Sequence, residues 1–244
     1  MHAARNHPIA LPVAAGSSVP SDKILLMNDL IQTFSIYALP IVFAITLHEA
    51  AHAYAAKYFG DTTAYAQGRM SLNPIKHIDP VGTLLIPIVL YFVGSPFLFG
   101  YAKPVPVNFG NLRNPKKQMA FVALAGPAAN LVMALMWMLL AIFLHAAGIG
   151  EEFFMRMAQA GILTNLVIFA FNLFPVPPLD GGRIMTSILP HKYAYKFAQL
   201  EPYGFFIVLG LAFLNVLHFW MAPVMAIAKT VLLLLVSPLT FLLN

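Results

Sequence analysis

The chain has 244 residues, of which 60% are hydrophobic and only 9% are charged. Roughly a quarter of the residues of an average soluble protein are charged, so this composition excludes an ordinary soluble domain. The formal net charge is +5, but the basic residues are scattered, and we expect no nucleic-acid partner. The chain has no cysteine, which excludes disulfides, iron–sulfur clusters and thiolate zinc sites.

Long uncharged stretches indicate several membrane-spanning helices. They cover residues 30–48, 81–102, 118–150, 157–179, 202–228 and 230–244. A helix of about 20 apolar residues crosses the hydrocarbon core of a bilayer. Together with a mean hydropathy of +0.78, these stretches predict an all-α polytopic membrane protein with about five transmembrane helices.

The N-terminal residues 1–29 are predicted to form a flexible tail. The first part of this segment is polar and contains Pro, Ser and Gly, and the apolar run begins only after Lys23. No obvious small-residue cleavage site follows the apolar run, so we do not expect a cleaved signal peptide.

Three ionisable residues, His48, Glu49 and His52, lie near the end of the first apolar stretch. Each such side chain in a membrane costs about 3 kcal/mol or more unless it is paired or coordinated, so it indicates function. Residues four apart project from one face of a helix, where two imidazoles can bind one metal ion. Glu49 can then take a proton from a water that zinc has acidified. Two core histidines bonded to backbone carbonyls are the structural alternative.

A catalytic zinc site needs a third protein ligand. The candidates are His77, His145, Glu151, Asp180, His191 and His218. Helix length places three of them, His145, Glu151 and His218, at the opposite membrane face. Asp180 follows three prolines, which cannot continue a helix, and it precedes two glycines and the next helical segment. This placement favours Asp180 as the third ligand, with a plain helix N-cap as the alternative.

Three segments together resemble the motif set of the site-2 protease family, intramembrane zinc metalloproteases. They are residues 48–52 (HEAAH), 126–130 (GPAAN) and 172–182 (NLFPVPPLDGG), in the order typical of that family. Residues 100–108 are similar to a segment of the smaller members that lack a PDZ domain. We see no PDZ insertion in this sequence.

The resemblance implies an enzyme that hydrolyses peptide bonds in or near transmembrane segments of single-span or other membrane-protein substrates. It implies one Zn²⁺ per chain, held by His48, His52 and Asp180. Glu49 is then the general base, and Asn172 matches a position that hydrogen-bonds the substrate backbone. We assign Asn130 either to substrate binding or to interhelical hydrogen bonding, which explains it equally well.

A different class of protein also places histidine and aspartate inside a bilayer, namely a membrane zinc carrier or a catalytically silent metal-binding protein. A carrier has no need of a carboxylate beside the first ligand, so Glu49 favours the protease. The sequence leaves the oligomeric state and the identity of the substrate open.

The shared metal constrains the topology, because its ligands must lie at one depth in the bilayer. We expect the motifs to meet near the cytoplasmic face of the plasma or inner membrane, where positively charged loops collect. One full crossing by residues 81–99 would separate them, so a re-entrant element followed by extended chain is predicted there. An edge within residues 66–77 or 99–109 is expected to pair with an unwound substrate.

Residues 30–201 are thus predicted to form the catalytic membrane core. The C-terminal residues 202–244 are expected to form two more transmembrane helices with a turn near Ala222, acting as scaffold or gate.

Overall fold

The computed structural model describes residues 21–93, 100 and 102–239, and it contains helices and no strand within these ranges. The chain divides into two compact units, Met1–Ser35 and Ile36–Asn244. Helix α1 (Ser21–Phe59) begins in the first unit and continues into the second. Four helical segments of the described residues are long and apolar enough to cross a membrane: Ile31–Phe59, Pro115–Ala146, Glu152–Asn172 and Val216–Leu239. The predicted all-α polytopic membrane class is confirmed.

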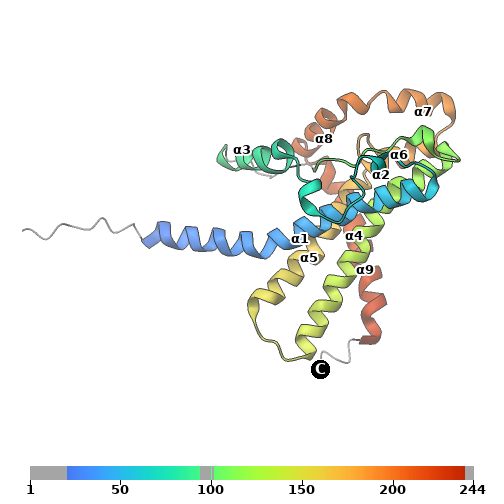
Figure 1. Cartoon of the computed structure of the whole chain (residues 1–244). Helices are drawn as coiled ribbons and strands as arrows, with labels where there is room; N and C mark the ends of the chain where they lie inside the picture. The colour runs from blue at the N-terminus through green and yellow to red at the C-terminus, as the bar shows by residue number, and fades with distance from the viewer. Residues whose placement is uncertain (1–20, 94–99, 101, 240–244) are drawn as a thin grey trace, which may run out of the picture. The chain divides into compact units, whose positions relative to one another are not determined.

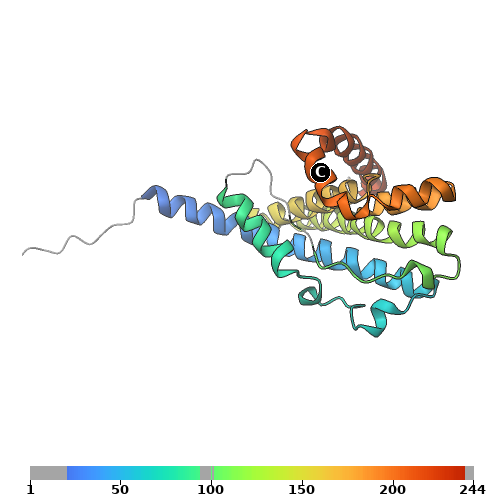
Figure 2. The same ribbon diagram turned by 90° about the horizontal axis from the view of Figure 1, so that it is seen from above.

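Three long helices form the packed centre of the second unit. Helices α4 (Pro115–Ala146) and α5 (Glu152–Asn172) are joined by a short turn and run antiparallel, and α9 (Val216–Val236) packs against both (Figures 1 and 2). Their shared cluster of buried side chains consists of Ala134, Met138, Ile142, Leu166, Ala228, Leu232 and Val236. Lipid is as apolar as these side chains, so close packing rather than exclusion of water holds such helices together.

Small residues set how closely these helices approach. A Cβ atom at Gly161 in α5 would overlap the indole ring of Trp137 in α4, so only glycine permits this contact. Such small-residue contacts are the usual means of bringing membrane helices together. The close approach places the next turn of α5 against the middle of α4.

The helical path breaks after α5 as the prolines predict. No regular helix covers residues 173–179, and α6 (Asp180–Ile188) follows and packs on α4. Asp180 is the first residue of α6 and Leu179 holds the N-cap position, so the N-cap alternative for Asp180 is wrong. Helix α7 (His191–Ala198) continues from α6.

Short helical turns fill much of the region between α1 and α4. They are α2 (Thr63–Ala66), η1 (Pro74–Lys76), η2 (Pro80–Leu85), α3 (Ile86–Phe92) and η3 (Phe109–Asn111). The helical run from Pro80 to Phe92 is shorter than the about 20 residues that a crossing needs, as a re-entrant element requires. The end of the predicted element, residues 94–99, lies outside the described residues.

The two segments in which extended edges are predicted differ in their helix content. Residues 66–77 include the end of α2 and all of η1, and residues 69–73 between them have no helix, so an edge that pairs with a substrate there stays a prediction. Residues 102–108 have no helix and run across the second unit, tied to the preceding loop where Lys103 N–H donates to the His77 carbonyl at 3.0 Å.

The C-terminal part differs from the expected pair of transmembrane helices. The turn lies at Asn215, whose φ of 58° is left-handed, and not near Ala222. Pro223 lies inside α9, where a membrane helix tolerates proline. The preceding η4 (Glu201–Tyr203) and ten-residue α8 (Gly204–Phe213) are too short to cross, which leaves four spanning helices in the described part instead of about five.

Candidate metal centre

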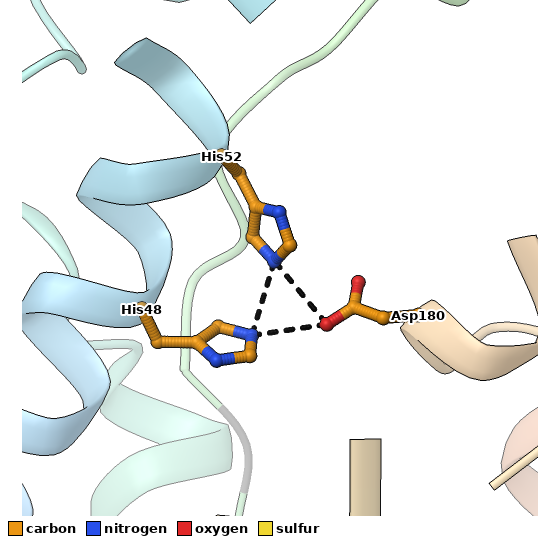
Figure 3. A group of neighbouring side chains, drawn as sticks. All are labelled: His48, His52 and Asp180. Atoms are coloured by element: carbon orange, nitrogen blue, oxygen red, sulfur yellow. Dashed lines mark hydrogen bonds and ion pairs between the residues drawn. The ribbon is translucent and has the colours of Figure 1, made fainter. Parts of the chain in front are cut away.

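Two histidines of α1 and one aspartate of α6 converge at one point (Figure 3). His48 and His52 are one helical turn apart on α1, and their Nε2 atoms lie 3.0 Å from each other. Asp180 Oδ2 lies 3.2 Å from His48 Nε2 and 3.3 Å from His52 Nε2. All three residues are buried. Within the described residues they form the one group of three potential metal ligands. His145, Glu151 and His218 take no part in it, as helix length predicts.

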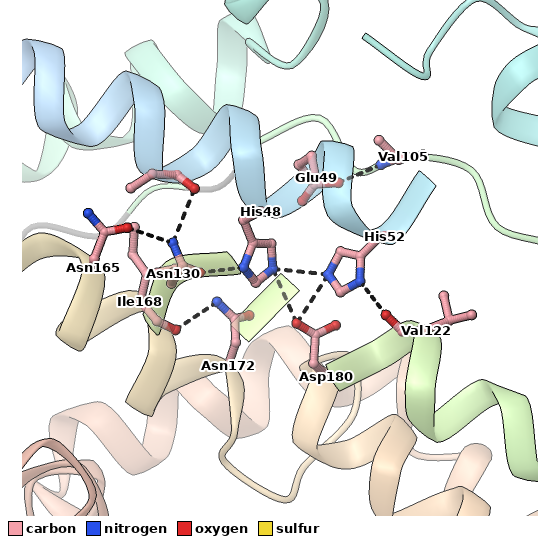
Figure 4. Close-up of polar contacts among 11 residues, drawn as sticks. His48, Glu49, His52, Val105, Val122, Asn130, Asn165, Ile168, Asn172 and Asp180 are labelled. Carbon is pink, nitrogen blue, oxygen red and sulfur yellow. Dashed lines mark hydrogen bonds and ion pairs between the residues drawn. The ribbon is translucent and has the colours of Figure 1, made fainter. Parts of the chain in front are cut away.

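Helix α4 supports both imidazoles with one of its faces (Figure 4). His52 Nδ1 donates to the Val122 carbonyl at 2.8 Å, and His48 Nδ1 lies 2.6 Å from Asn130 Oδ1. Gly126 lies midway between these two partners, and a Cβ atom there would overlap both imidazole rings. Val122, Gly126 and Asn130 follow one another at intervals of four residues, so they share one side of the helix. The GPAAN motif therefore lies near the middle of α4, rather than in its first turns, and serves as the wall behind the histidines.

The position of the proton on the imidazole rings leaves acceptor atoms facing the centre, which suits a cation. A carbonyl oxygen only accepts hydrogen bonds, so His52 Nδ1 carries the proton and a neutral His52 presents a lone pair at Nε2. Asp180 Oδ2 is buried and has no hydrogen-bond donor in the described part of the chain. Acceptor atoms this close repel one another unless a proton or a metal ion lies among them. Two imidazole nitrogens and one carboxylate oxygen are a ligand set that suits zinc.

The charge state of Asp180 agrees with this assignment. Burial by itself would raise the pKa of its carboxyl group, but the neighbouring imidazoles of His52 and His48 outweigh burial and lower the pKa below its ordinary value. The carboxyl group is therefore ionised at neutral pH, which is the form that binds a metal.

Glu49 is held by a different part of the chain. Its Oε2 atom accepts a hydrogen bond of 2.7 Å from the backbone N–H of Val105. Val105 lies between Pro104 and Pro106, neither of which has a backbone N–H, so it is the single backbone donor of that triplet. Glu49 is half-buried, and Figure 4 shows its carboxylate on the side of α1 toward residues 102–108.

The buried Asp61 anchors the same extended segment just beyond the end of α1. It accepts hydrogen bonds from the Asn108 backbone N–H at 2.8 Å, from the Asn111 side chain at 3.0 Å and from Thr63. Burial would raise the pKa of Asp61, but hydrogen bonds from Thr63, Asn111 and Asn108 outweigh it and lower the pKa below its usual range. Asp61 thus fixes one end of the segment that reaches Glu49.

The two predicted asparagines occupy different environments. Asn130 is fully buried and bonds to α1 and α5, which is the interhelical role among the two expected for it. Asn172 is half-buried at the end of α5, and its Nδ2 donates to the Ile168 carbonyl of the same helix at 3.0 Å. A role of Asn172 toward a substrate stays a prediction.

Sequence reasoning missed several residues that support this centre directly or through a neighbour. Val122 and Val105 act through backbone atoms, which carry no side-chain signal. Asn165, which bonds to Asn130, is a polar residue in the middle of an apolar stretch, and this exception to the pattern is the signal that could have found it.

The fold and this centre together define a polytopic membrane metalloprotein. The model of peptidase family M50 matches residues 146–217. The chain is 41% identical over 180 residues to YwhC of Bacillus subtilis, which covers 70% of this chain and 77% of that protein. It is 30% identical over 223 residues to Rip2 of Mycolicibacterium smegmatis, and the matched part covers 88% of this chain and 83% of that protein. The names of both relatives contain the words zinc metalloprotease.

The chain belongs to peptidase family M50, the site-2 protease family, and is a zinc metalloprotease with Zn²⁺ as its cofactor. An archaeal relative, the zinc metalloprotease MJ0392 of Methanocaldococcus jannaschii, is 26% identical over 170 residues, which cover 70% of this chain and 39% of that protein. No solved structure is significantly similar to the chain.

Proposed function

We propose that this protein hydrolyses peptide bonds in or near transmembrane segments of other membrane proteins, with Glu49 as the general base. The zinc ligands in this proposal are His48, His52 and Asp180. The observation that carries it is the convergence of these three side chains, whose potential ligand atoms lie 3.0 to 3.3 Å from one another. They meet beside helices that are long and apolar enough to lie in a bilayer.

An apolar cavity beside the centre supports a substrate from the membrane. It lies between α1 and α4 and is lined by Leu47, Ala50, Ala51, Tyr54, Leu72, Ala129, Val132 and Met133. Leu47 precedes His48 and Ala51 precedes His52 in the sequence, so the same turns of α1 contribute to the cavity and to the metal centre. An apolar lining suits the side chains of a transmembrane segment better than those of a soluble peptide.

The residues of this chain divide the work of hydrolysis. Bound zinc supplies Lewis acidity, which polarises a peptide carbonyl and acidifies water. The Glu49 carboxylate takes the proton of the attacking water and later delivers it to the leaving amine. The Val105 N–H holds Glu49 Oε2 in place and leaves the other carboxylate oxygen to accept the proton. Asn172 and the extended residues 102–108 are proposed to bind the unwound backbone of the substrate, whose freed polar groups need partners in lipid.

We further propose that the centre faces the cytoplasmic side of the plasma or inner membrane. Ten of the 14 Lys and Arg residues lie in the segments 57–117 and 183–196, which follow His52 and Asp180 in the sequence, while Glu151 and Glu152 lie at the far end of α4 and α5. An excess of Lys and Arg in short loops marks the cytoplasmic side.

The decisive experiment uses purified protein in detergent with a single-span substrate. We expect Glu49→Gln to keep zinc and to lower cleavage by about 10²- to 10⁴-fold, the usual contribution of a general base. Glu151→Gln makes the same chemical change on an exposed residue at the far end of α4 and is expected to cleave like the wild type. Full cleavage by Glu49→Gln would remove Glu49 as the base, and zinc uptake into proteoliposomes without cleavage would favour a carrier.

A further inference from the structure

Asn165 is a fully buried polar residue in the membrane helix α5, and it contacts none of the three proposed zinc ligands. Its amide bonds to Asn130 of α4, and Asn130 in turn bonds to His48 of α1 (Figure 4). We propose that Asn165 is a positioning residue that acts through Asn130 to fix the tautomer of His48, so that Nε2 is free to bind zinc. This inference rests on the proposed zinc site.

The orientation of the Asn165 amide follows from its helix. One end of the amide lies 2.8 Å from the Gly161 carbonyl, which can only accept a hydrogen bond. The atom facing Gly161 is therefore the amide nitrogen, and the amide oxygen faces Asn130. Asn165 thus presents an acceptor to Asn130.

The orientation of the Asn130 amide follows from that of Asn165. Asn130 Nδ2 lies 3.0 Å from Asn165 Oδ1 and 3.2 Å from the Ala44 carbonyl, so both of its N–H groups have acceptors. A flipped Asn130 would place its oxygen against these two acceptors and lose both bonds. Asn130 Oδ1 is consequently the atom that faces His48, at 2.6 Å from Nδ1.

This chain of hydrogen bonds decides which nitrogen of His48 carries the proton. An amide oxygen at Nδ1 requires a proton there, and a neutral imidazole then has its lone pair at Nε2. His48 Nε2 is the atom that faces His52 and Asp180. For His52 a backbone carbonyl accepts the Nδ1 proton directly, whereas for His48 the acceptor is a side-chain amide that a second amide helps to orient. Partners of this kind orient the ring and raise its basicity as a ligand.

The packing of α5 keeps Asn165 at the required distance. Gly161 lies one turn before Asn165 and touches the Trp137 ring where any Cβ atom would overlap it, so α5 cannot withdraw from α4 without opening this contact. An unpaired amide is unfavourable in lipid, which offers it no hydrogen-bond partner, so the amides of Asn165 and Asn130 remain bonded to each other.

The test compares zinc affinity among full-length variants, measured by competition with a chromophoric chelator. Asn130→Ala is expected to weaken zinc binding by about 10- to 100-fold, the usual effect of losing an outer partner of a ligand. Asn165→Leu, which removes the acceptor for Asn130, is expected to weaken it by about 3- to 10-fold, because the Ala44 carbonyl still orients Asn130. The double variant is expected to bind zinc as Asn130→Ala does, since Asn165 acts only through Asn130.

A second readout follows the proton itself. In metal-free protein with ¹⁵N-labelled histidine, we expect His48 to carry its proton on Nδ1 in the wild type and to populate the Nε2 form in Asn165→Leu. Leu166→Ala is the matched control, because it truncates a buried neighbour in the same helix. It is expected to lower the unfolding temperature and to leave both zinc affinity and the His48 tautomer unchanged.

Three outcomes would overturn the inference: unchanged zinc affinity in Asn165→Leu, multiplied effects in the double variant, or an unchanged His48 tautomer. Asn165→Ala carries the same test without added bulk if the leucine variant does not fold. Failure of the proposed function has a different signature, because His48→Ala would then bind zinc as tightly as the wild type.

Discussion

Two of the three proposed metal ligands and the proposed general base lie on neighbouring turns of α1, yet two different regions of the molecule hold them. The ligand side consists of helices: α4 supports both imidazoles, α5 supports α4, and α6 brings Asp180. The base side consists of residues 102–108, which have no helix and contact Glu49 through one backbone N–H.

From this difference we expect that metal binding and proton transfer can be adjusted separately. On the ligand side, a change in one side chain alters the shape or the hydrogen bonds around the imidazoles, and so alters zinc affinity. On the base side, the contact uses the backbone, so residues of different kinds can occupy position 105 as long as they keep the N–H. We therefore expect ligand-side variants to lose zinc, and base-side variants to keep zinc and lose turnover.

The largest effect is expected for Asp180→Ala. It removes a proposed ligand together with its negative charge. Loss of an outer partner of a ligand weakens metal binding by about 10- to 100-fold, and we expect zinc affinity to fall by more than this. Metal content after dialysis and chelator competition measure this loss. A variant that keeps stoichiometric zinc would show that Asp180 is not a ligand.

Gly126→Ala is expected to rank second. The new methyl group would overlap both imidazole rings, so α4 or the rings must move, and zinc affinity should fall by about 10- to 100-fold. Gly210→Ala is the matched control, because Gly210 lies in α8 with open space around it. Equal zinc affinity in the two variants would mean that the wall formed by α4 does not hold the ligands.

On the base side, Val105→Pro removes the N–H that binds Glu49 and leaves the metal ligands untouched. A hydrogen bond to a charged group is worth about 1.5–3 kcal/mol, so kcat should fall by about 10- to 100-fold at constant zinc content. Val105→Ala keeps the N–H and truncates the buried side chain, so it should keep kcat while lowering stability. Loss of zinc in Val105→Pro would show that residues 102–108 also support the metal ligands, against the division of roles between the two regions.

Asp61→Asn should have the smallest effect on turnover and act mainly on stability. The substitution places an amide N–H donor opposite the Asn108 N–H, where the carboxylate oxygen had accepted a hydrogen bond. The free energy of unfolding should fall by about 1.5–3 kcal/mol. Because the pKa of Asp61 is lowered by folding, its stabilisation is complete above the unfolded pKa of about 4 and is lost as the pH falls through the lower folded value.

Thermal unfolding over a pH series checks this last prediction. The gap in unfolding temperature between the wild type and Asp61→Asn should be widest near neutral pH and should narrow in acid. A gap that stays constant with pH would show that the charge of Asp61 does not stabilise the loop.

Local patterns predicted much of the centre. The spacing of His48 and His52 places both on one helix face whatever the rest of the fold, and the prolines before Asp180 end α5 before that residue. The C-terminal turn was misplaced because Pro223, a helix breaker in water, is accommodated inside α9, while Asn215 makes the turn through a left-handed backbone. A local rule failed there because the surroundings of the helix decide the outcome.

By itself, the sequence determined the class of the protein and pointed to the type of metal-binding chemistry and to the side chains proposed to supply it, because each depends on composition or on residues within one or two turns. Only the tertiary structure decided which atoms face each ring nitrogen, that Asn165 reaches His48 through Asn130, and that Val105 meets Glu49. These contacts join residues that are far apart in the chain. They depend on how each helix is rotated and how closely it approaches its neighbour, which small residues such as Gly126 and Gly161 set only once the helices are packed.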